Sequence, residues 1–332
     1  MTNIHLNTRQ PWFVGFGGLL LTLVLTAHAA PLTPGEPIAL GKTQGTFDFI
    51  RIDTAKHRLL LAHTKNKTLD VFDLDARKLL KSVATGAAQD CAADDKNGRY
   101  YVAVSAPPRM AIVDAVKLEM IGEVPLSAPA DLMTFNPANG LAYVCNDEAP
   151  ELWVIDPAAK KITATLKLSG KGMEDLAFDP ANKRLFQVVK DNHTLVVIDP
   201  ASNKVLETWN TEPASNPHGM AIVPDADTLL VAGGNGKLAL MSRSTGKVLA
   251  SAEIASRVDE MAYDPELHLA YCASSAGKLS VVRVTGDTLV SLGDVPTAAG
   301  AKSVVVDPKT HTVWIAYSKG TQSFVQPLDP AK

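Results

Sequence analysis

The chain repeats itself seven times, with a period of about 42 residues. The unit is clearest at residues 175–209, DLAFDPANKRLFQVVKDNHTLVVIDPASNKVLETW, where turn-forming residues separate four short runs rich in β-branched residues. An Asp or Asn occupies the first turn in six of the units; the seven positions are Asp53, Asp94, Asn136, Asp179, Val223, Asp264 and Asp307. Four strands in a repeat of roughly 40–50 residues are typical of one propeller blade. The sequence therefore predicts an all-β fold, a seven-bladed β-propeller.

The first-turn aspartates have a structural explanation. An Asp or Asn side chain at the start of a turn can accept hydrogen bonds from backbone N–H groups two or three residues later, and a following Pro presets the next φ angle. We therefore interpret the recurrent Asp-Pro pairs as turn caps.

The last repeat lacks a fourth strand. Its runs KSVVVD, TVWIAY and SFVQPL predict three strands, after which the sequence ends at Lys332. The segment EPIALGK, residues 36–42, precedes the first repeat and resembles the fourth runs of other units, such as KVLETW. We expect this N-terminal strand to complete the last blade and close the ring, because closure removes exposed sheet edges.

The first 29 residues have the pattern of a secretory signal peptide. Arg9 precedes an apolar run from Trp12 to Ala27, and Ala27-His28-Ala29 matches a small-x-small cleavage site. Residues 30–332 are then expected to form a single propeller domain in the periplasm or outside the cell, with no stable membrane insertion after cleavage. We expect this domain to be a monomer.

The charge balance indicates which partners to expect. Removing Arg9 with the signal peptide leaves 31 basic and 35 acidic residues, so the mature chain is slightly acidic. Nucleic acids and anionic membranes are bound mainly by clustered Lys and Arg, and such a cluster is missing from the sequence. No nucleic-acid partner is expected.

Linear catalytic and metal motifs are absent from the sequence. Cys91, Cys145 and Cys272 form no CxxC pair, and there is no G-x-S-x-G, HExxH or Walker A pattern. We assign no catalytic residue. Propeller sites are nevertheless assembled from single residues of different blades, so this absence excludes little.

Polar residues recur just before each predicted inner strand, where the blades converge at one mouth of the central channel. The position five residues before each first-turn residue is occupied, in chain order, by Asp48, Gln89, Asp131, Glu174, His218, Asp259 and Lys302. The next position reads Phe49, Asp90, Leu132, Asp175, Gly219, Glu260 and Ser303. Our candidate ligand-binding residues are Asp48, Asp131, Glu174, His218 and Asp259, followed by Asp90, Asp175 and Glu260. The sequence does not decide which of the two positions faces the channel.

A mouth lined by several carboxylates favours a cationic ligand. Like charges brought close together are unfavourable unless they are protonated, paired or bridged by a cation. Oxygen ligands favour Ca²⁺, Mg²⁺ or Mn²⁺, for which the candidate ligands are Asp131, Glu174, His218 and Asp259. No other cofactor is indicated. A cationic small molecule or a basic protein segment fits the same charges, and the acids can also be explained as turn caps beside ordered water.

One segment carries a family resemblance. The run LAYVCNDEAPELWVID, residues 141–156, resembles the YVTN repeat, in which Y-V-x-N is followed by L-x-V-I-D. The chain is similar in this respect to YncE-like members of the YVTN β-propeller family, although only the third and fourth repeats show the motif well. The resemblance implies an exported seven-bladed propeller, and many members of the family are known only as binding proteins.

Three classes of function remain open, and the sequence favours the first. The first is a non-enzymatic binding protein with its ligand at the mouth. The second is a metal-dependent propeller enzyme, a lactonase-type hydrolase or a lyase, in which an acid-bound cation would polarise a carbonyl while His218 moved the proton. The third is an assembly module that binds partners through outer loops near Arg109 and Glu148.

Overall fold

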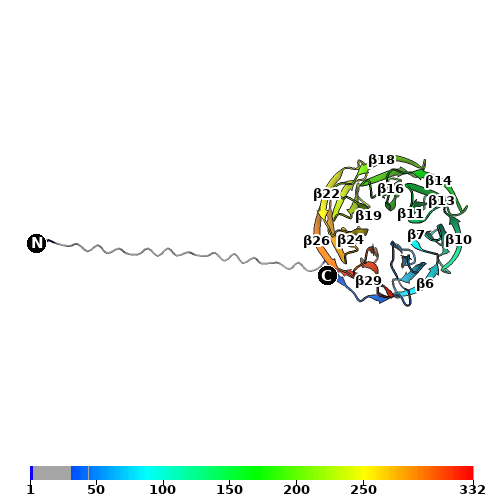
Figure 1. Cartoon of the computed structure of the whole chain (residues 1–332), viewed down its shortest axis with the longest axis horizontal. Helices are drawn as coiled ribbons and strands as arrows, with labels where there is room; N and C mark the ends of the chain where they lie inside the picture. Colours follow the sequence, from blue (N-terminus) through cyan, green and yellow to red (C-terminus); the bar gives the residue numbers. More distant parts are fainter. Residues whose placement is uncertain (3–30, 44, 332) are drawn as a thin grey trace.

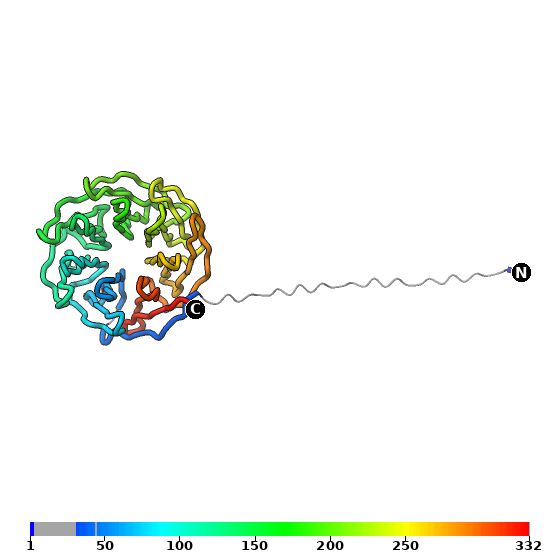
Figure 2. The backbone as a smooth tube through the Cα atoms, turned by 180° about the vertical axis from the view of Figure 1, so that it is seen from behind, coloured from blue at the N-terminus to red at the C-terminus, as the bar shows by residue number. Residues whose placement is uncertain are grey.

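The computed structural model describes residues 1–2, 31–43 and 45–331. Apart from its first two residues, the predicted signal peptide lies outside this part of the chain. The described residues from 31 onward form antiparallel sheets arranged as a closed ring, and they contain no helix (Figures 1 and 2). The predicted seven-bladed β-propeller is thus confirmed. No helix among the described residues has the length and apolar character needed to cross a membrane.

Each blade is a meander of successive strands. Blades 1 to 3 comprise β3 (Ile50–Asp53), β4 (Arg58–His63), β5 (Thr68–Asp73) and β6 (Lys78–Ala84); β7 (Ala88–Asp94), β8 (Arg99–Val104), β9 (Arg109–Asp114) and β10 (Glu119–Pro125); and β11 (Ala130–Asn136), β12 (Leu141–Asn146), β13 (Glu151–Asp156) and β14 (Lys161–Lys167). Blades 4 and 5 comprise β15 (Met173–Asp179), β16 (Arg184–Val189), β17 (Thr194–Asp199) and β18 (Lys204–Asn210); and β19 (Pro217–Val223), β20 (Thr228–Gly233), β21 (Lys237–Ser242) and β22 (Val248–Glu253).

Blade 6 and the three C-terminal strands of blade 7 complete the ring. They are β23 (Val258–Asp264), β24 (Leu269–Ser274), β25 (Lys278–Thr285) and β26 (Thr288–Pro296); and β27 (Ser303–Val306), β28 (Val313–Lys319) and β29 (Gln322–Pro330). The first strand of each blade lies at the centre of the ring and the fourth at its periphery, as β7 and β10 illustrate (Figure 1). We call the end of the ring at which the inner strands begin the mouth.

The hydrophobic core lies between neighbouring blades. Consecutive side chains of a middle strand point to opposite faces of its sheet, and in this ring both faces are covered. On β4, Leu59 packs in a cluster with Trp314 of blade 7, whereas Leu60 packs in a cluster with Tyr100 of blade 2. All four side chains are buried. Burial on both faces explains why the second and third runs of each repeat are continuously apolar rather than alternating.

The first-turn aspartates cap their turns, as predicted. Asp53 Oδ1 accepts a hydrogen bond from the Lys56 N–H at 2.9 Å, and Asp264 Oδ1 accepts one from the Glu266 N–H at 3.0 Å. Several of these carboxylates also bind the next blade: Tyr100 on blade 2 donates its hydroxyl to Asp53 Oδ2 at 2.6 Å. These buried acids therefore join neighbouring blades as well as stabilising turns.

The N-terminal segment closes the ring by pairing with β29, as predicted, but in two pieces. Strand β2 (Ile38–Ala39) pairs with β29 through Ile38 and Val325, within the predicted range 36–42. An additional strand, β1 (Leu32–Pro34), pairs farther along β29. Pro37, between the two strands, lacks the N–H group that a continuous ladder needs, which explains the interruption.

Candidate functional site

The seven predicted mouth residues lie at or just before the starts of the inner strands, and Lys302 neutralises two of the acids. Its Nζ donates to Asp48 Oδ1 at 2.8 Å and to Asp259 Oδ2 at 2.6 Å, so one ammonium group connects blades 6, 7 and 1. Burial raises the pKa of Asp48, with Asp259 adding to the effect, and Lys302 only partly offsets it. Despite its own burial, Lys302 has a raised pKa because Asp48 and Asp259 face it.

Glu174 on β15 lies beside two basic side chains. It forms an ion pair with Lys190, and its Oε1 is 3.9 Å from His218 Nε2. Burial is the main reason why the pKa of Glu174 is raised, because His218 and Lys190 lower it without fully compensating. His218 Nδ1 lies 2.7 Å from the Asn216 carbonyl oxygen, which can only accept, so Nδ1 carries a proton. His218 is thus anchored to its own turn and presents Nε2 toward Glu174.

Asp131 differs from the other mouth carboxylates because it has no cationic partner. It forms neither a hydrogen bond nor an ion pair with any side chain in the described part of the protein. Burial raises its pKa well above the ordinary value, and the charges of Asp48, Glu174 and Asp147 raise it further. In the neighbouring blade, Gln89 Oε1 is buried without a hydrogen-bond partner among the described residues. Blades 2 and 3 therefore form the side of the mouth where acceptor oxygens remain unsatisfied.

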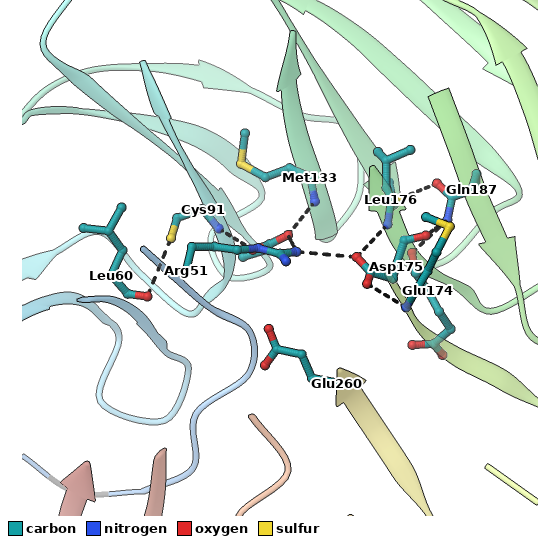
Figure 3. A network of polar contacts seen from close by, with 12 residues as sticks. Arg51, Leu60, Cys91, Met133, Glu174, Asp175, Leu176, Gln187 and Glu260 are labelled. Carbon is teal, nitrogen blue, oxygen red and sulfur yellow. Dashed lines mark hydrogen bonds and ion pairs between the residues drawn. The ribbon is translucent and has the colours of Figure 1, made fainter. Parts of the chain in front are cut away.

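The acids of the second position are buried clamps between blades. Asp90 on β7 accepts the N–H of its neighbour Cys91 at 2.7 Å and the N–H of Met133 on blade 3 at 3.1 Å. Asp175 accepts the N–H of its neighbour Leu176 at 2.9 Å and that of Met220 on blade 5 at 3.0 Å (Figure 3). Glu260 accepts the N–H of Val304 on blade 7 at 3.0 Å. A register irregularity at the start of these inner strands accompanies the change from the mouth-facing to the buried position.

Arg51 on β3 lies among these three acids, in a network that crosses the inner strands (Figure 3). Its Nε and Nη2 donate to the two carboxylate oxygens of Asp90 at 2.9 Å each, and Nη2 lies 3.6 Å from Asp175 Oδ1. Glu260 points toward the same guanidinium but forms no ion pair with it within the described residues. Burial raises the pKa of Glu260 well above its usual value despite the opposing charge of Arg51. Three buried carboxylates thus share a single arginine.

A cavity of about 380 Å³ lies beside this network in the centre of the ring. Its lining includes Arg51, Asp175 and, toward the other end of the inner strands, Thr134, Asp95 and Phe178. The Arg51 side chain is 30 % exposed, so part of its guanidinium faces this space. Arg51 therefore lines the central cavity on the side of the acid network.

The structure brings the candidate metal ligands to one end of the ring without grouping them into one ligand set. Glu174 and Asp259 are bound to Lys190 and Lys302, and Asp131 remains unpaired. Within the described residues, no three His, Cys, Asp or Glu side chains are grouped so that they could hold a metal ion. Among the described residues of the mouth, Asp131 and Gln89 instead offer oxygens without a hydrogen-bond partner.

Two groups of polar residues were missed by the sequence analysis. Arg51 stands where other blades have Ala92, Thr134 and Ala177, and its charge at that aligned position is the signal that could have revealed it. The second group is a Ser-His-Asp arrangement that no linear spacing indicated: the Ser323 Oγ to His63 Nε2 distance is 3.2 Å and the His63 Nδ1 to Asp70 Oδ2 distance is 2.7 Å.

The Ser-His-Asp arrangement joins the two ends of the ring. Ser323 lies on β29 of blade 7, whereas His63 and Asp70 lie on β4 and β5 of blade 1. All three side chains have no exposed surface, so a substrate cannot reach the serine hydroxyl. His63 Nε2 also lies 3.0 Å from the Gly45 carbonyl oxygen. We therefore assign this network to ring closure rather than to nucleophilic catalysis.

Fold and mouth together define a seven-bladed β-propeller with a polar channel entrance. No protein-family model matches the chain, and no curated protein matches it in sequence. Solved structures match it over most of its length. A chain of the Kuenenia stuttgartiensis hydrazine synthase is 18% identical, covering 85% of this chain and 95% of that one, with a TM-score of 0.74.

Two further solved structures match the fold at lower sequence identity. The WD40 repeats of RRP9 are 10% identical, covering 89% of this chain and 99% of that one, with a TM-score of 0.76. U3-55K is 10% identical, covering 88% and 98%, with a TM-score of 0.75. At these identities the likeness establishes the propeller fold and nothing about the activity.

Proposed function

We propose that this chain is an exported binding protein that holds a cationic ligand at the mouth of its propeller. The observation that carries the proposal is Asp131, a partly buried carboxylate without a partner in the described residues, whose pKa is raised by burial and by neighbouring acids. A bound cation would relieve this electrostatic cost. The rigid blades position the carboxylate before the ligand arrives, so little ordering entropy is lost on binding.

The internal cations restrict where such a ligand would bind. Lys302 occupies the space between Asp48 and Asp259, and Lys190 occupies one side of Glu174. The ligand would therefore approach from blades 2 and 3, where Asp131 and Gln89 offer unsatisfied oxygens. A divalent ion (Ca²⁺, Mg²⁺ or Mn²⁺), an organic ammonium group or a basic protein segment would each supply the required charge.

The proposal includes the YVTN-type, YncE-like assignment and export. Both rest on the sequence: on the motif at residues 141–156 and on the signal-like segment 1–29. The metal-dependent hydrolase or lyase alternative would need a cation beside His218. No observation in the described residues favours that alternative over simple binding, because His218 faces Glu174 and its own turn.

Thermal unfolding of the purified protein tests the proposal. After chelation, Ca²⁺, Mg²⁺, Mn²⁺, 1,4-diaminobutane and a lysine-rich peptide would be added one at a time. A site filled at 100 times its Kd adds about 2.7 kcal/mol of stability, enough for a clear rise in Tm. We expect at least one cation to raise the Tm and Asp131→Asn to abolish that rise.

Glu36→Gln supplies the control, because Glu36 is an exposed acid in the segment between β1 and β2. It should leave the ligand-induced shift unchanged. The proposal is wrong if none of the five probes raises the Tm of the wild-type protein, or if the rise survives in Asp131→Asn.

A further inference from the structure

A second cavity lies between blades 4 and 5, on the face of the ring opposite the mouth. Its volume is about 580 Å³, within the range of small-molecule pockets. The turn at residues 179–182 forms one wall and the turn at residues 224–227 forms the other. Phe178 and Ile222, at the ends of their inner strands, contribute apolar surface. None of our sequence-based candidate residues lines this cavity.

The side chain that binds the first-turn Asp differs from blade to blade. Between blades 1 and 2, Tyr100 occupies the second position of its strand and reaches Asp53 with its hydroxyl group. Blade 5 has Leu229 at the aligned position, which is too short to reach Asp179 of blade 4. Arg243, at the end of the third strand of blade 5, binds Asp179 instead, with Nη1 2.7 Å from Oδ2.

Arg243 lines the cavity, yet its charge is already matched. Its side chain is 7% exposed, Nη1 binds the Asp179 carboxylate and Nη2 donates to the Ala226 carbonyl oxygen. Its Nε is buried without an acceptor among the described residues. The guanidinium is therefore held by the protein itself, and its buried Nε is not exposed to a ligand in the cavity.

The remaining charges around the cavity are negative. Asp227 accepts hydrogen bonds from Ser242 and Ser244 at 3.0 and 2.5 Å, which leave its charge in place. Asp225 is exposed at the rim and forms no hydrogen bond or ion pair within residues 31–43 and 45–331. Three carboxylates and a single guanidinium therefore line the space. This excess disfavours an anion and favours a cation near Asp225.

We propose that this cavity binds a small organic cation with an apolar body. The cationic nitrogen would pair with Asp225, and the apolar body would contact Phe178 and Ile222. The site does not depend on the proposed function of the mouth, because the two lie at opposite ends of the inner strands.

A matched series of phenylalanine derivatives tests the site. Phenylalaninamide carries the ammonium group, the ring and the carbonyl oxygen; 3-phenylpropionamide lacks the ammonium group, and phenylalanine adds a carboxylate. Binding to the full-length protein would be followed by NMR chemical-shift changes at residues 179–182 and 224–227. We expect phenylalaninamide to bind with a Kd on the order of 1 mM, as a ligand of this size allows. The two analogues should bind at least tenfold more weakly.

Two variants locate the interaction. Asp225→Asn should reduce phenylalaninamide binding to the level of 3-phenylpropionamide, and Ala181→Trp should block the cavity from its exposed turn without disturbing the buried core. Asp287→Asn, a carboxylate-to-amide change in an exposed hairpin on the same face, should bind like wild type. The assignment is overturned if phenylalaninamide causes no shifts at these turns, if phenylalanine binds as tightly, or if Asp225→Asn binds unchanged.

Discussion

Adjacent acidic residues in one strand have different roles in this protein. At the mouth, Asp131 and Glu174 lie partly open. Lys190 and His218 partly compensate the charge of Glu174, whereas Asp131 has no cationic partner among the described residues. One residue later, Asp175 turns away, becomes buried and accepts two backbone N–H groups, one of them from the next blade. A shift of one residue thus separates a candidate ligand-binding carboxylate from a structural clamp.

Glu260 is the least satisfied of the buried clamps, and its substitution tests this electrostatic description. Its pKa is raised well above the usual value, so the cost of ionising it grows as the pH rises above the unfolded value of about 4.3. Glu260→Gln keeps an acceptor for the Val304 N–H without the charge. We expect the variant to be more stable than wild type at pH 8, by about 1.4 kcal/mol for each pH unit by which folding raises the pKa of Glu260.

Guanidinium chloride unfolding at pH 4 and pH 8 provides the measurement, and the advantage of Glu260→Gln should vanish at pH 4. Asp90→Asn is the contrasting variant, because it removes the negative charge and replaces one of the two oxygens that accept from Arg51 with a donor group, and it should destabilise the protein by about 3 kcal/mol. A Glu260→Gln protein that is less stable than wild type at pH 8 would contradict the description.

For His57 we expect a pH dependence of the free energy of unfolding with the opposite sign. Burial lowers the pKa of His57, but hydrogen bonds to Asp307 and Asp75, both 2.8 Å long, outweigh this effect and the pKa is raised. The stabilisation should be present below pH 6.5 and be lost as the pH rises through the raised pKa. His57→Asn, which tolerates the φ of 51° at this position, should cost about 1–2 kcal/mol at pH 6 and less at pH 9.

The measurement for His57→Asn is the free energy of unfolding from pH 5 to pH 9. His268→Asn is a suitable control, since His268 also has a positive φ (55°) but does not bridge two blades through carboxylates among the described residues. A constant difference between wild type and His57→Asn across this range would show that the charge of His57 does not stabilise the closing contact between blades 1 and 7.

At the scale of elements, the closing strands have an effect out of proportion to their length. Strands β1 and β2 comprise only three and two residues. They nevertheless cover the outer edge of β29, and Leu32 and Leu40 beside them are almost completely buried. A short segment can close the ring because the other six blades are already positioned by their neighbours.

Deletion of residues 31–42 should therefore destabilise the entire ring. The loss of Leu32 and Leu40 alone removes two fully buried leucines, each worth about 2–5 kcal/mol, and the exposed edge of β29 would promote association. We expect a lower Tm and oligomers in size-exclusion chromatography with light scattering. An equal-length deletion cannot serve as control, so Thr33→Lys, an exposed substitution in β1, is used and should remain monomeric. A monomeric deletion variant with an unchanged Tm would contradict this prediction.

At the scale of the whole molecule, the two ends of the propeller meet. The Ala331 N–H donates to the Pro31 carbonyl oxygen at 3.1 Å, and β1 and β29 run antiparallel beside each other. Chain ends in contact favour circular permutation. In the natural connectivity one blade is built from both ends, so the ring is closed by backbone hydrogen bonds and not only by contacts between blades.

A circular permutant tests this closure. It joins residue 331 to residue 31 through a short glycine linker and begins at Gly300, between blades 6 and 7. Each blade is then continuous, and only side-chain packing joins blade 6 to blade 7. We expect the permutant to fold but to have a lower Tm than wild type. A second permutant that begins at Gly286, within the β25–β26 hairpin, keeps a blade shared by both ends and should be nearer to wild type. Equal stability of the first permutant and wild type would contradict this role of the closing strands.

The number of blades, the turn caps and the closing strand were predictable because each depends on a local pattern in the sequence. Apolar runs, turn residues and a fixed spacing recur in every unit, so the sequence by itself determined the seven-bladed ring. The candidate mouth residues were also found by alignment of the repeats. Charge pairing was not predictable, because Arg51 with Asp90 and Lys302 with Asp48 join different blades, and Lys302 and Asp48 are separated by nearly the whole chain.

Tertiary structure alone decided which acids are neutralised and which remain available. The inner strands converge on one axis, so residues about 42 positions apart come within hydrogen-bonding distance, and a register irregularity turns one of two adjacent acids inward. The cavity beside Arg243 likewise lies between the turns of two blades, so the sequence of either blade alone does not indicate it. Local sequence specified the blades, whereas the packing between blades specified the sites.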